Sequence, residues 1–419
     1  MAKPLVAWVT TRFPHGLGEQ FITAEIDAWR DADARVVIVP GAMGGPARPL
    51  PEGFEVDDVL TRAWASRATL LRAAAAAMRD PALRTELADL RARGVLTRRS
   101  AVIALRAVAQ ARIVQAALAD LAARRGTIDV AYTYWLKPHT SGAVRARDEG
   151  HVRHVISRAH GSDLYEETRP AHYNPLVRTV GAGLDCLYPI SEQGCGYVQQ
   201  TYGIRPERVR RGRLGTRIPS PRIEVAPGEP GEVSLLSVSS ITPVKRLDLV
   251  VDAIAHVARG VEGRAVVRWR HYGSGFQQDQ IERRVAEVLE PLGVRTEFMG
   301  LVPHEDLLEA LAHQPVDLML NLSSSEGVPV SIMEAQVRGI PCLATDVGAT
   351  REVLGEDSPY LVPSDANAEE IGRRVLDLLE DARSAARRSA VREIVEERFD
   401  AARNFPAFVS DVLERVARP

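Results

Sequence analysis

The sequence predicts an α/β fold built from two parallel-sheet domains, and three observations support this. Short apolar runs alternate with helical stretches along most of the chain, which is the pattern of parallel strands joined by crossover helices. The length of 419 residues is more than one core ordinarily organises. A polar connector rich in proline and glycine, residues 218–232, separates two series of such strands. We therefore expect two Rossmann-like domains.

Ten apolar runs are expected to form the strands. In chain order they are residues 5–10, 35–39, 130–133, 154–157, 186–190, 233–238, 265–271, 295–298, 318–322 and 341–345. Because the connector divides them five and five, we predict an N-terminal domain over residues 1–218 and a C-terminal domain over residues 219–400. The final segment, residues 401–419, is expected to be a helix that crosses back to the N-terminal domain.

Residues 61–125 depart from this alternation. They form a long stretch of alanine, leucine and arginine, broken near Pro81 and Gly94, that predicts two or three amphipathic helices inserted into the first domain. Such helices either pack on the domain as a cap or lie on a membrane surface through an arginine-rich face, which would give a weak peripheral association. The sequence leaves both roles open.

Composition narrows the class of protein. The net charge of −2 gives no overall field that favours nucleic acid. Three widely spaced cysteines predict neither a disulfide framework nor a metal site, and they suit a reducing compartment. The apolar run of residues 5–9 is too short for a signal-peptide core, and we expect no stretch close to the ~20 apolar residues of a membrane span. The prediction is a cytoplasmic protein whose oligomeric state stays open.

Two glutamates bracket a predicted loop-to-helix turn directly after the strand of residues 318–322. Pro329 suits the first position of a helix, and the free amides of Val328 and Val330 would carry partial positive charge, which makes a seat for a diphosphate. Carboxylates beside a phosphate would repel it unless they face hydroxyl groups, so we predict that both bind sugar. The residues predicted to bind here are Glu326, Gly327, Val328, Pro329, Val330 and Glu334. The alternative is that both are solvated helix acids.

This pair of glutamates with seven residues between them, together with residues 335–353, resembles the signature segment of glycosyltransferase family 4. The resemblance is strong over residues 155–353, fair over residues 1–40 and absent over residues 61–125. It implies the GT-B architecture, in which two Rossmann-like domains face each other across a cleft. The C-terminal domain would then bind a nucleotide-sugar donor and the N-terminal domain an acceptor.

Residues 158–165 resemble the family's His-Gly-x-Asp turn. The resemblance implies that His160 contacts the donor sugar and the forming bond, with Asp163 and His15 on the acceptor side. A buried structural histidine is the alternative.

Residues 237–246 resemble the loop that supplies two cations to the diphosphate, but the position expected to hold arginine is Ser240, and only Lys245 matches. Lysine is rare here, since three lysines stand against 50 arginines among 53 basic residues, so its retention at Lys245 is notable. Either Lys245 alone does more than is usual, or Arg246 or an arginine of residues 205–217 replaces the missing cation. Two further turns, around Gly273 and around Gly300 and Leu301, resemble those that line the nucleotide base.

The loop after the first strand contains Gly16 and Gly18, which we predict approach phosphate or acceptor. It is also a partial dinucleotide fingerprint. The third glycine is missing, and no acid ends the strand of residues 35–39, which argues against an NAD enzyme.

The resemblance implies retaining transfer of a sugar from a UDP or GDP sugar to a small natural product or to a glycan or lipid-linked acceptor. We assign catalysis to His160, Lys245 and Glu326. Lys245 and the Val328 and Val330 amides would stabilise the departing diphosphate, while Glu326 holds the sugar hydroxyls. Glu334 would hold the ribose. No Asp-x-Asp motif is present, so we expect no metal and no cofactor besides the co-substrate. A non-catalytic sugar-nucleotide binder and a sugar-nucleotide epimerase are the alternatives.

Overall fold

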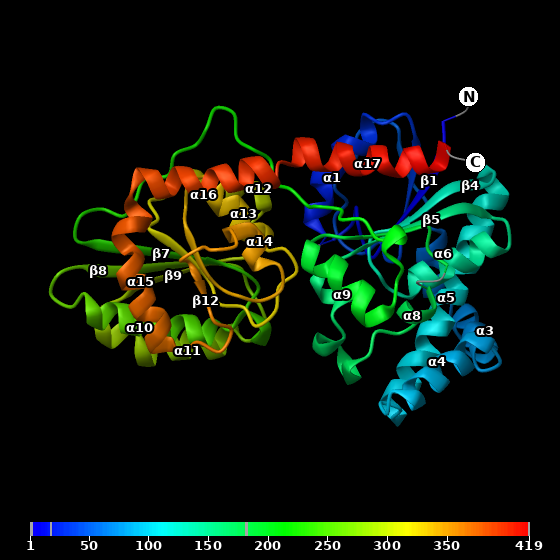
Figure 1. Cartoon of the computed structure of the whole chain (residues 1–419), viewed down its shortest axis with the longest axis horizontal. Helices are drawn as coiled ribbons and strands as arrows, with labels where there is room; N and C mark the ends of the chain where they lie inside the picture. Colours follow the sequence, from blue (N-terminus) through cyan, green and yellow to red (C-terminus); the bar gives the residue numbers. More distant parts are fainter. Residues whose placement is uncertain (1–2, 17–18, 181–182, 418–419) are drawn as a thin grey trace. The chain divides into compact units, whose positions relative to one another are not determined.

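A computed structural model of the chain describes residues 3–16, 19–180 and 183–417. The chain divides into two compact units (Figure 1). The first comprises Met1–Arg213 together with Ala402–Pro419, and the second comprises Leu214–Ala401. Figure 1 shows helices on both sides of the sheet in each unit. We describe each unit by itself.

The first unit is built on a parallel sheet with the strand order β3-β2-β1-β4-β5-β6. Its strands are β1 (Leu5–Thr10), β2 (Arg35–Pro40), β3 (Phe54–Val56), β4 (Ile128–Thr133), β5 (Val152–Ala159) and β6 (Cys186–Pro189). Five of these correspond to the apolar runs of the first half. The sequence analysis missed β3, because this three-residue edge strand has no fully buried residue and therefore no apolar run.

The helices of this unit are α1 (Thr23–Arg30), α2 (Val59–Ala65), α3 (Arg67–Ala77), α4 (Pro81–Ala92), α5 (Arg98–Arg125), α6 (Pro138–Asp148), α7 (Gly161–Leu164), α8 (Val177–Val180), α9 (Glu192–Tyr202) and α17 (Ala401–Ala417). The last of these follows the second unit in sequence but packs on the first. Phe408 of α17 contacts the rings of Tyr132 and Tyr188, and the guanidinium of the buried Arg158 lies 3.9 Å from the Phe408 ring centroid.

The insertion between β3 and β4 consists of α2 to α5, so its described residues form four helices where the sequence predicted two or three. A capping box at Thr97 starts α5, whose buried face packs against α6 and α3. Asp80, at the start of α4, pairs with Arg112 and Arg145 and so ties α4 to α5 and α6.

The expectation that no stretch approaches a membrane span does not hold by length and composition alone. Among the described residues, α5 is long and apolar enough to cross a membrane, with a mean hydropathy of 1.4 over its most apolar window. In the structure 44% of that window is buried inside the protein, and a core helix of a soluble protein can satisfy the same criteria of length and composition.

The second unit has a parallel sheet with the strand order β12-β11-β10-β7-β8-β9. Its strands are β7 (Glu232–Val238), β8 (Val266–Tyr272), β9 (Arg295–Gly300), β10 (Leu318–Asn321), β11 (Cys342–Thr345) and β12 (Leu361–Val362). Its helices are α10 (Leu247–Gly260), α11 (Gln278–Val288), α12 (His304–His313), α13 (Val330–Gln336), α14 (Thr350–Leu354), α15 (Ala368–Arg383) and α16 (Ala385–Arg398). All five apolar runs of the second half form strands. The two-residue edge strand β12 is too short to give a periodic signal.

Candidate functional site

The turn that carries Glu326 follows β10, whose four residues are all buried. Pro329 occupies the N-cap of α13, and Ile332 and Met333 of this helix are buried. Gly348 packs against the backbone of this turn and has a positive φ of 53°. A Cβ at this position would lie 1.9 Å from the Glu326 carbonyl oxygen. Only glycine lets the two backbones approach this closely. The conformation of the Glu326 loop therefore depends on the loop after β11.

Lys245 and Glu326 contact each other directly. The Lys245 Nζ lies 2.6 Å from the Glu326 Oε1, and the two side chains are only 24% and 10% exposed. The sequence analysis gave the lysine to the diphosphate and the carboxylate to the sugar, without pairing them. The structure brings the two charges together, so an incoming anion would compete with Glu326 for the ammonium group.

Arg246, one of the predicted alternatives for the second cation, is engaged with the protein backbone in this structure. Its backbone lies in the left-handed region with a φ of 47°, and its guanidinium donates to the carbonyls of Leu322, Ser323 and Ser364. These bonds fix the start of α10 to the end of β10. Because its donors are engaged with backbone carbonyls, Arg246 has a structural role, and Ser240 stays without a replacement on this loop.

Glu334 lies on the first turns of α13 and is 5% exposed. Its Oε1 is 2.6 Å from the Nε2 of His304, the first residue of α12. The hydrogen bond to this carboxylate raises the pKa of His304 above its ordinary value, although burial opposes the shift. The sequence analysis missed His304. Its place just after the base-lining turn at Leu301 was the available signal, but one histidine at a helix start predicts no partner.

The two turns predicted to line the base lie side by side. The Gly273 amide donates to the Gly300 carbonyl at 2.9 Å, and a Cβ on Gly273 would lie 1.8 Å from the Ser239 carbonyl oxygen. Neighbouring Ser240 is exposed, and Leu301 is 56% exposed.

The strand order explains why these residues gather. The loops with Glu326, Ser240, Gly273 and Gly300 follow β10, β7, β8 and β9, which are adjacent in this sheet. Ligands of open parallel sheets bind at this carboxyl edge. The backbone amides of Val328 and Val330 donate to no other described group, so they are available to a ligand there.

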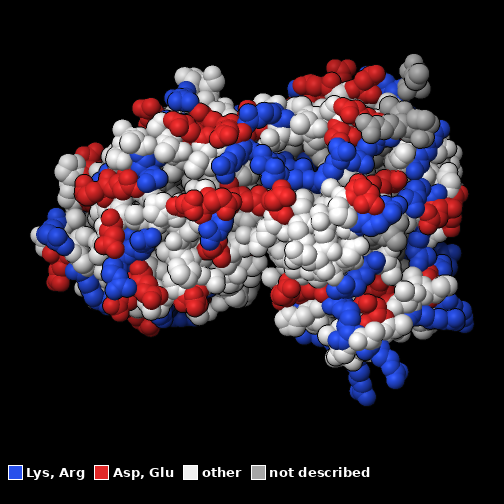
Figure 2. Space-filling view, in the orientation of Figure 1, with Lys and Arg blue, Asp and Glu red and all other residues white. Residues whose placement is uncertain are grey.

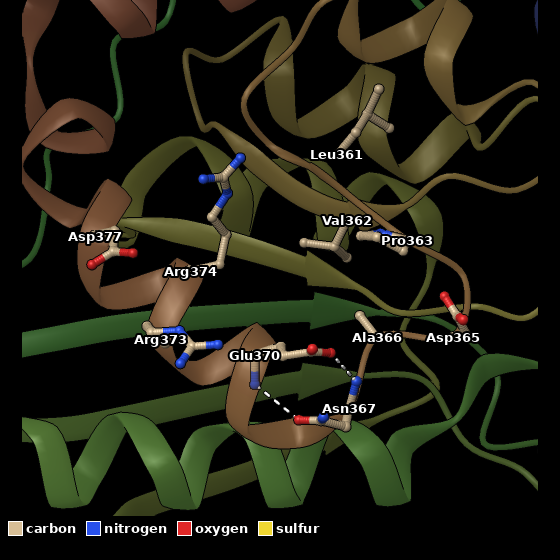
Figure 3. A pocket seen from close by; sticks show the side chains of 10 residues that line it. All are labelled: Leu361, Val362, Pro363, Asp365, Ala366, Asn367, Glu370, Arg373, Arg374 and Asp377. Carbon is tan, nitrogen blue, oxygen red and sulfur yellow. Dashed lines mark hydrogen bonds between the residues drawn. The ribbon is translucent and has the colours of Figure 1, made fainter.

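A cavity of about 480 Å³ lies elsewhere in the second unit, between β12 and the start of α15 (Figure 3). It contains none of the predicted site residues. Its polar lining includes Asn367 and Glu370, whose mutual hydrogen bonds form the capping box of α15. These capping hydrogen bonds explain the positions of Asn367 and Glu370, so no ligand is needed to explain them.

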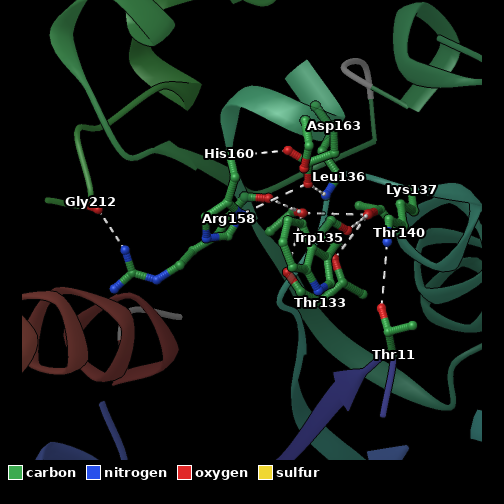
Figure 4. A network of polar contacts seen from close by, with 12 residues as sticks. Thr11, Thr133, Trp135, Leu136, Lys137, Thr140, Arg158, His160, Asp163 and Gly212 are labelled. Carbon is green, nitrogen blue, oxygen red and sulfur yellow. Dashed lines mark hydrogen bonds and ion pairs between the residues drawn. The ribbon is translucent and has the colours of Figure 1, made fainter. Parts of the chain in front are cut away.

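In the first unit, His160 follows β5 and is 7% exposed (Figure 4). Its ring packs against Tyr134 and Trp135, with centroid separations of 4.8 and 4.5 Å. Neither ring nitrogen has a hydrogen-bond partner of ordinary geometry among the described residues, and an Asp163 carboxylate oxygen lies 3.9 Å from Nδ1. A buried histidine with both nitrogens unsatisfied suits contact with a substrate better than a purely structural role.

Asp163 is fully buried, and its carboxylate accepts the backbone amides of His160 and Leu136 (Figure 4). It thereby joins the carboxyl ends of β5 and β4 and fixes the turn that holds His160. The prediction that Asp163 contacts the acceptor is corrected here, because both of its oxygens are engaged with the backbone.

The predicted glycine loop also differs from expectation. The Gly16 amide donates to the Pro46 carbonyl and its own carbonyl accepts from Arg48, so its backbone is engaged with another loop and not open to a donor. Gly18 lies outside the described residues. His15 is half-buried and bridges Ala47 through the backbone, and nothing here favours an acceptor contact.

Glu19, which the sequence analysis did not select, occupies the centre of this loop. Its carboxylate accepts the amides of Thr11, Arg12 and Phe13 and the indole N–H of Trp135. Burial opposes ionisation, yet these hydrogen bonds hold the pKa of Glu19 below its ordinary value. The amides at the end of β1 are therefore filled by the protein's own carboxylate.

The arginines between residues 205 and 217 were offered as another source of the missing cation. Arg210 pairs with Asp411 and Arg211 pairs with Glu192, both within the first unit. These contacts give both arginines a partner within the first unit. Within the described ranges, no group of three or more His, Cys, Asp or Glu side chains is arranged to hold a metal ion.

Comparison with known proteins matches the second unit to a glycosyltransferase family model. Residues 222–394, which lie inside the second unit, match the family model of glycosyl transferases group 1. This part of the chain is therefore similar to the glycosyl transferases of group 1.

Curated proteins match part of this chain. The putative colanic acid biosynthesis glycosyltransferase WcaL of Escherichia coli (strain K12) is 30% identical over 54% of this chain and 56% of its own length. The N-acetyl-alpha-D-glucosaminyl L-malate synthase of Bacillus anthracis is 26% identical over 57% of this chain and 62% of its own. The D-inositol 3-phosphate glycosyltransferase of Nocardia farcinica is 27% identical over 55% of this chain and 53% of its own length. The chain thus spans a little more than half the length of these relatives.

Solved structures confirm the fold class. The HepE protein of Anabaena, in complex with UDP and glucose, superposes with a TM-score of 0.65 at 15% identity, covering 98% of this chain and all of that one. Sucrose-phosphate synthase from Thermosynechococcus elongatus superposes with a TM-score of 0.72 at 14% identity over the full length of both chains. The predicted GT-B class, with two Rossmann-like domains and a helical insertion in the first, is confirmed.

Proposed function

We propose that this glycosyltransferase transfers a sugar, with retention at the anomeric carbon, from a UDP or GDP sugar to an acceptor. The observation that carries the proposal is the Lys245–Glu326 pair. It stands beside two free backbone amides, on a turn at the carboxyl edge of the sheet, inside the region that matches the family model.

The chemistry follows from the charges. Departure of a diphosphate leaves an oxocarbenium-like sugar and builds negative charge on the leaving group. Lys245 and the Val328 and Val330 amides stabilise that charge. On donor binding, the Lys245 ammonium turns from Glu326 to the diphosphate, which releases the Glu326 carboxylate to accept hydrogen bonds from sugar hydroxyls. Glu334 accepts from the ribose, and its bond to His304 holds it in place.

His160 keeps both ring nitrogens for a substrate and is our third candidate for catalysis. We also propose that the reaction needs neither metal nor organic cofactor. The support for this is that Lys245 and the two amides supply the electrophilic groups that a metal ion would otherwise provide.

The acceptor is either a small molecule or a glycan or lipid-linked molecule. The relatives' names include both kinds, since one concerns colanic acid and the others L-malate and inositol 3-phosphate. We propose a cytoplasmic location, which agrees with the presence of only three cysteines, all of them buried.

We further propose that the insertion gives this protein a weak affinity for anionic membrane surfaces. Leu71 and Met78 of the α3 region are 73% and 61% exposed. The exposed arginines nearby are Arg67, Arg72, Arg79, Arg84, Arg91, Arg98, Arg99 and Arg106.

Within the described segment of residues 59–106, no acid is left to balance these arginines. The acids between residues 59 and 106 are Asp80, Glu86 and Asp89, and each is engaged inside the unit. Figure 2 shows Lys and Arg side chains projecting at the lower right, where Figure 1 places α3 and α4. Exposed apolar groups among unbalanced cations suit the interface of an anionic bilayer.

Product analysis tests the enzymatic proposal. Calorimetry first selects the nucleotide, UDP or GDP, that the purified protein binds. Incubation with its sugar nucleotides and candidate acceptors then gives one of three results: release of the nucleoside diphosphate with a new α- or β-linkage, an epimerised donor, or binding without turnover. A new glycoside with the donor's anomeric configuration supports the proposal. The second and third results would assign the epimerase or the non-catalytic binder instead.

A further inference from the structure

Lys137 occupies an unusual position in the first unit (Figure 4). It is the N-cap of α6, directly after the loop that ends β4, and it is half-buried. Its Nζ lies 4.6 Å from the Trp135 ring centroid and 3.5 Å from the Thr11 hydroxyl oxygen. Across the described ranges it forms no ion pair, whereas Lys3 pairs with Asp33 and Lys245 with Glu326.

The carboxylates that act on Lys137 are already engaged. Glu19 accepts three backbone amides and the Trp135 indole, and Asp163 accepts two amides. They hold a local fold together and do not contact the ammonium group. Burial lowers the pKa of Lys137, and these two acids only partly offset that effect. The ammonium is therefore desolvated without a counter-ion in contact.

Unsatisfied hydrogen-bonding groups lie in the same region. The ring of Trp135, which contacts the Lys137 ammonium, also packs against His160, whose two nitrogens are buried without a partner. Arg169 adds a second positive charge close enough to lower the pKa of Lys137 further, and its buried Nε has no partner among the described groups. Buried polar groups are ordinarily satisfied, so this cluster of cations and free nitrogens indicates a ligand.

The strand order of the first unit explains why these residues lie close together. Thr11 follows β1, Trp135 and Lys137 follow β4, and His160 follows β5, and these three strands are neighbours in the order β1-β4-β5. Their carboxyl ends form one edge, which is where ligands of parallel sheets bind.

We propose that Lys137, with Arg169 and His160, binds an anionic group of the acceptor, either a carboxylate or a phosphate monoester. The word acceptor rests on the function proposed above, whereas binding of an anion at Lys137 does not. The ammonium neutralises the anion, the guanidinium Nε–H donates to it, and a ring nitrogen of His160 contributes a further hydrogen bond to the acceptor. The Trp135 face covers the carbon skeleton next to the anion.

The scarcity of lysine makes a direct test possible. Reductive methylation with ¹³C-formaldehyde labels Lys3, Lys137, Lys245 and the amino terminus, and it retains their positive charges. Substitution of each lysine by glutamine assigns the NMR signals. The full chain is then titrated with inorganic phosphate and, separately, with malonate, in the presence of the saturating nucleoside diphosphate so that the donor site is filled.

We expect the Lys137 signal to shift saturably with at least one of the two anions, while the Lys3 signal stays in place. Preference for phosphate assigns a phosphorylated acceptor, and preference for malonate assigns a carboxylate. In calorimetry of the unlabelled protein, Lys137→Gln should weaken the preferred anion about tenfold or more, since bonds to charged groups are the stronger class. His160→Phe, which retains the ring packing, should weaken it less.

A Lys137 signal that stays fixed up to high anion concentration would overturn the proposal, as would one that merely moves in parallel with Lys3. So would a Lys137→Gln protein that binds the anion as the wild type does. Failure of the glycosyltransferase function would be seen separately, as absence of nucleotide binding or turnover in the unmodified protein.

Discussion

At the scale of single residues, the pairing of Lys245 with Glu326 makes this lysine the sharpest test of the donor site. If Lys245 carries most of the side-chain stabilisation of the departing diphosphate, Lys245→Ala should lower turnover by ~10²–10³, about 2.7–4 kcal/mol. Steady-state kinetics with saturating donor measures this. Ser240→Arg in the same background should recover part of the rate, because it supplies a cation on the same loop.

Lys3→Ala is the matched control, since Lys3 forms only an exposed ion pair and should keep full turnover. Near-normal turnover in Lys245→Ala would show that another cation serves the leaving group.

The His304–Glu334 pair predicts a pH dependence of stability. Because Glu334 raises the pKa of His304 in the folded protein, the pair stabilises the fold fully below the unfolded pKa of about 6.5, and this stabilisation is lost as pH rises through the higher folded value. The melting temperature of the wild type should therefore exceed that of His304→Gln by more at pH 6 than at pH 9. His313→Gln, on the same helix, is the control. If the difference in melting temperature between the wild type and His304→Gln stays constant with pH, the His304–Glu334 ion pair does not contribute to stability.

At the scale of elements, the loop after β11 supports the loop after β10 through one glycine. Gly348→Ala adds a Cβ that would meet the Glu326 carbonyl oxygen at 1.9 Å, at a φ of 53°. The Glu326 loop must move, so nucleotide affinity measured by calorimetry should fall by about tenfold or more. Gly196→Ala, whose Cβ meets nothing within 4 Å, should leave affinity unchanged. Equal affinity in both variants would mean that the loop does not shape the donor site.

The insertion helices predict binding to anionic vesicles. Flotation with phosphatidylserine-containing vesicles should recover the wild type, and replacing Arg72, Arg79 and Arg99 by glutamine should remove about 3 kcal/mol of attraction, at ~1 kcal/mol per arginine. The control replaces three exposed arginines of the second unit, Arg259, Arg264 and Arg295. If wild type and both triple variants remain unbound at low salt, the insertion acts only as a cap on the first unit.

At the scale of the whole molecule, the proposed metal independence has a simple expected outcome. Saturating EDTA should leave the initial rate within about twofold, because Lys245 and backbone amides perform the electrostatic work at the diphosphate. A rate that collapses with EDTA and returns with Mg²⁺ or Mn²⁺ would mean that the diphosphate site is wrongly described.

The sequence by itself determined the architecture. Apolar runs of four to seven residues indicate buried parallel strands whatever surrounds them, and all ten predicted strands exist. The sequence also predicted the resemblance to glycosyltransferases. This was possible because the spacing of Glu326 and Glu334 after β10 is a local property of one turn. The sequence did not predict the edge strands β3 and β12, because a strand of two or three residues has too few buried positions to give a recognisable apolar pattern.

Tertiary structure alone decided how the charged groups are used. Arg246 and Asp163 looked available in sequence, but the fold engages them with backbone groups. The Glu19 carboxylate accepts the backbone amides of the glycine loop that the sequence offered to a ligand. His304 contacts Glu334 from another helix. Such partners lie far apart in the chain, and a side chain's charge is satisfied by whatever stands within about 3 Å, which only the folded backbone sets.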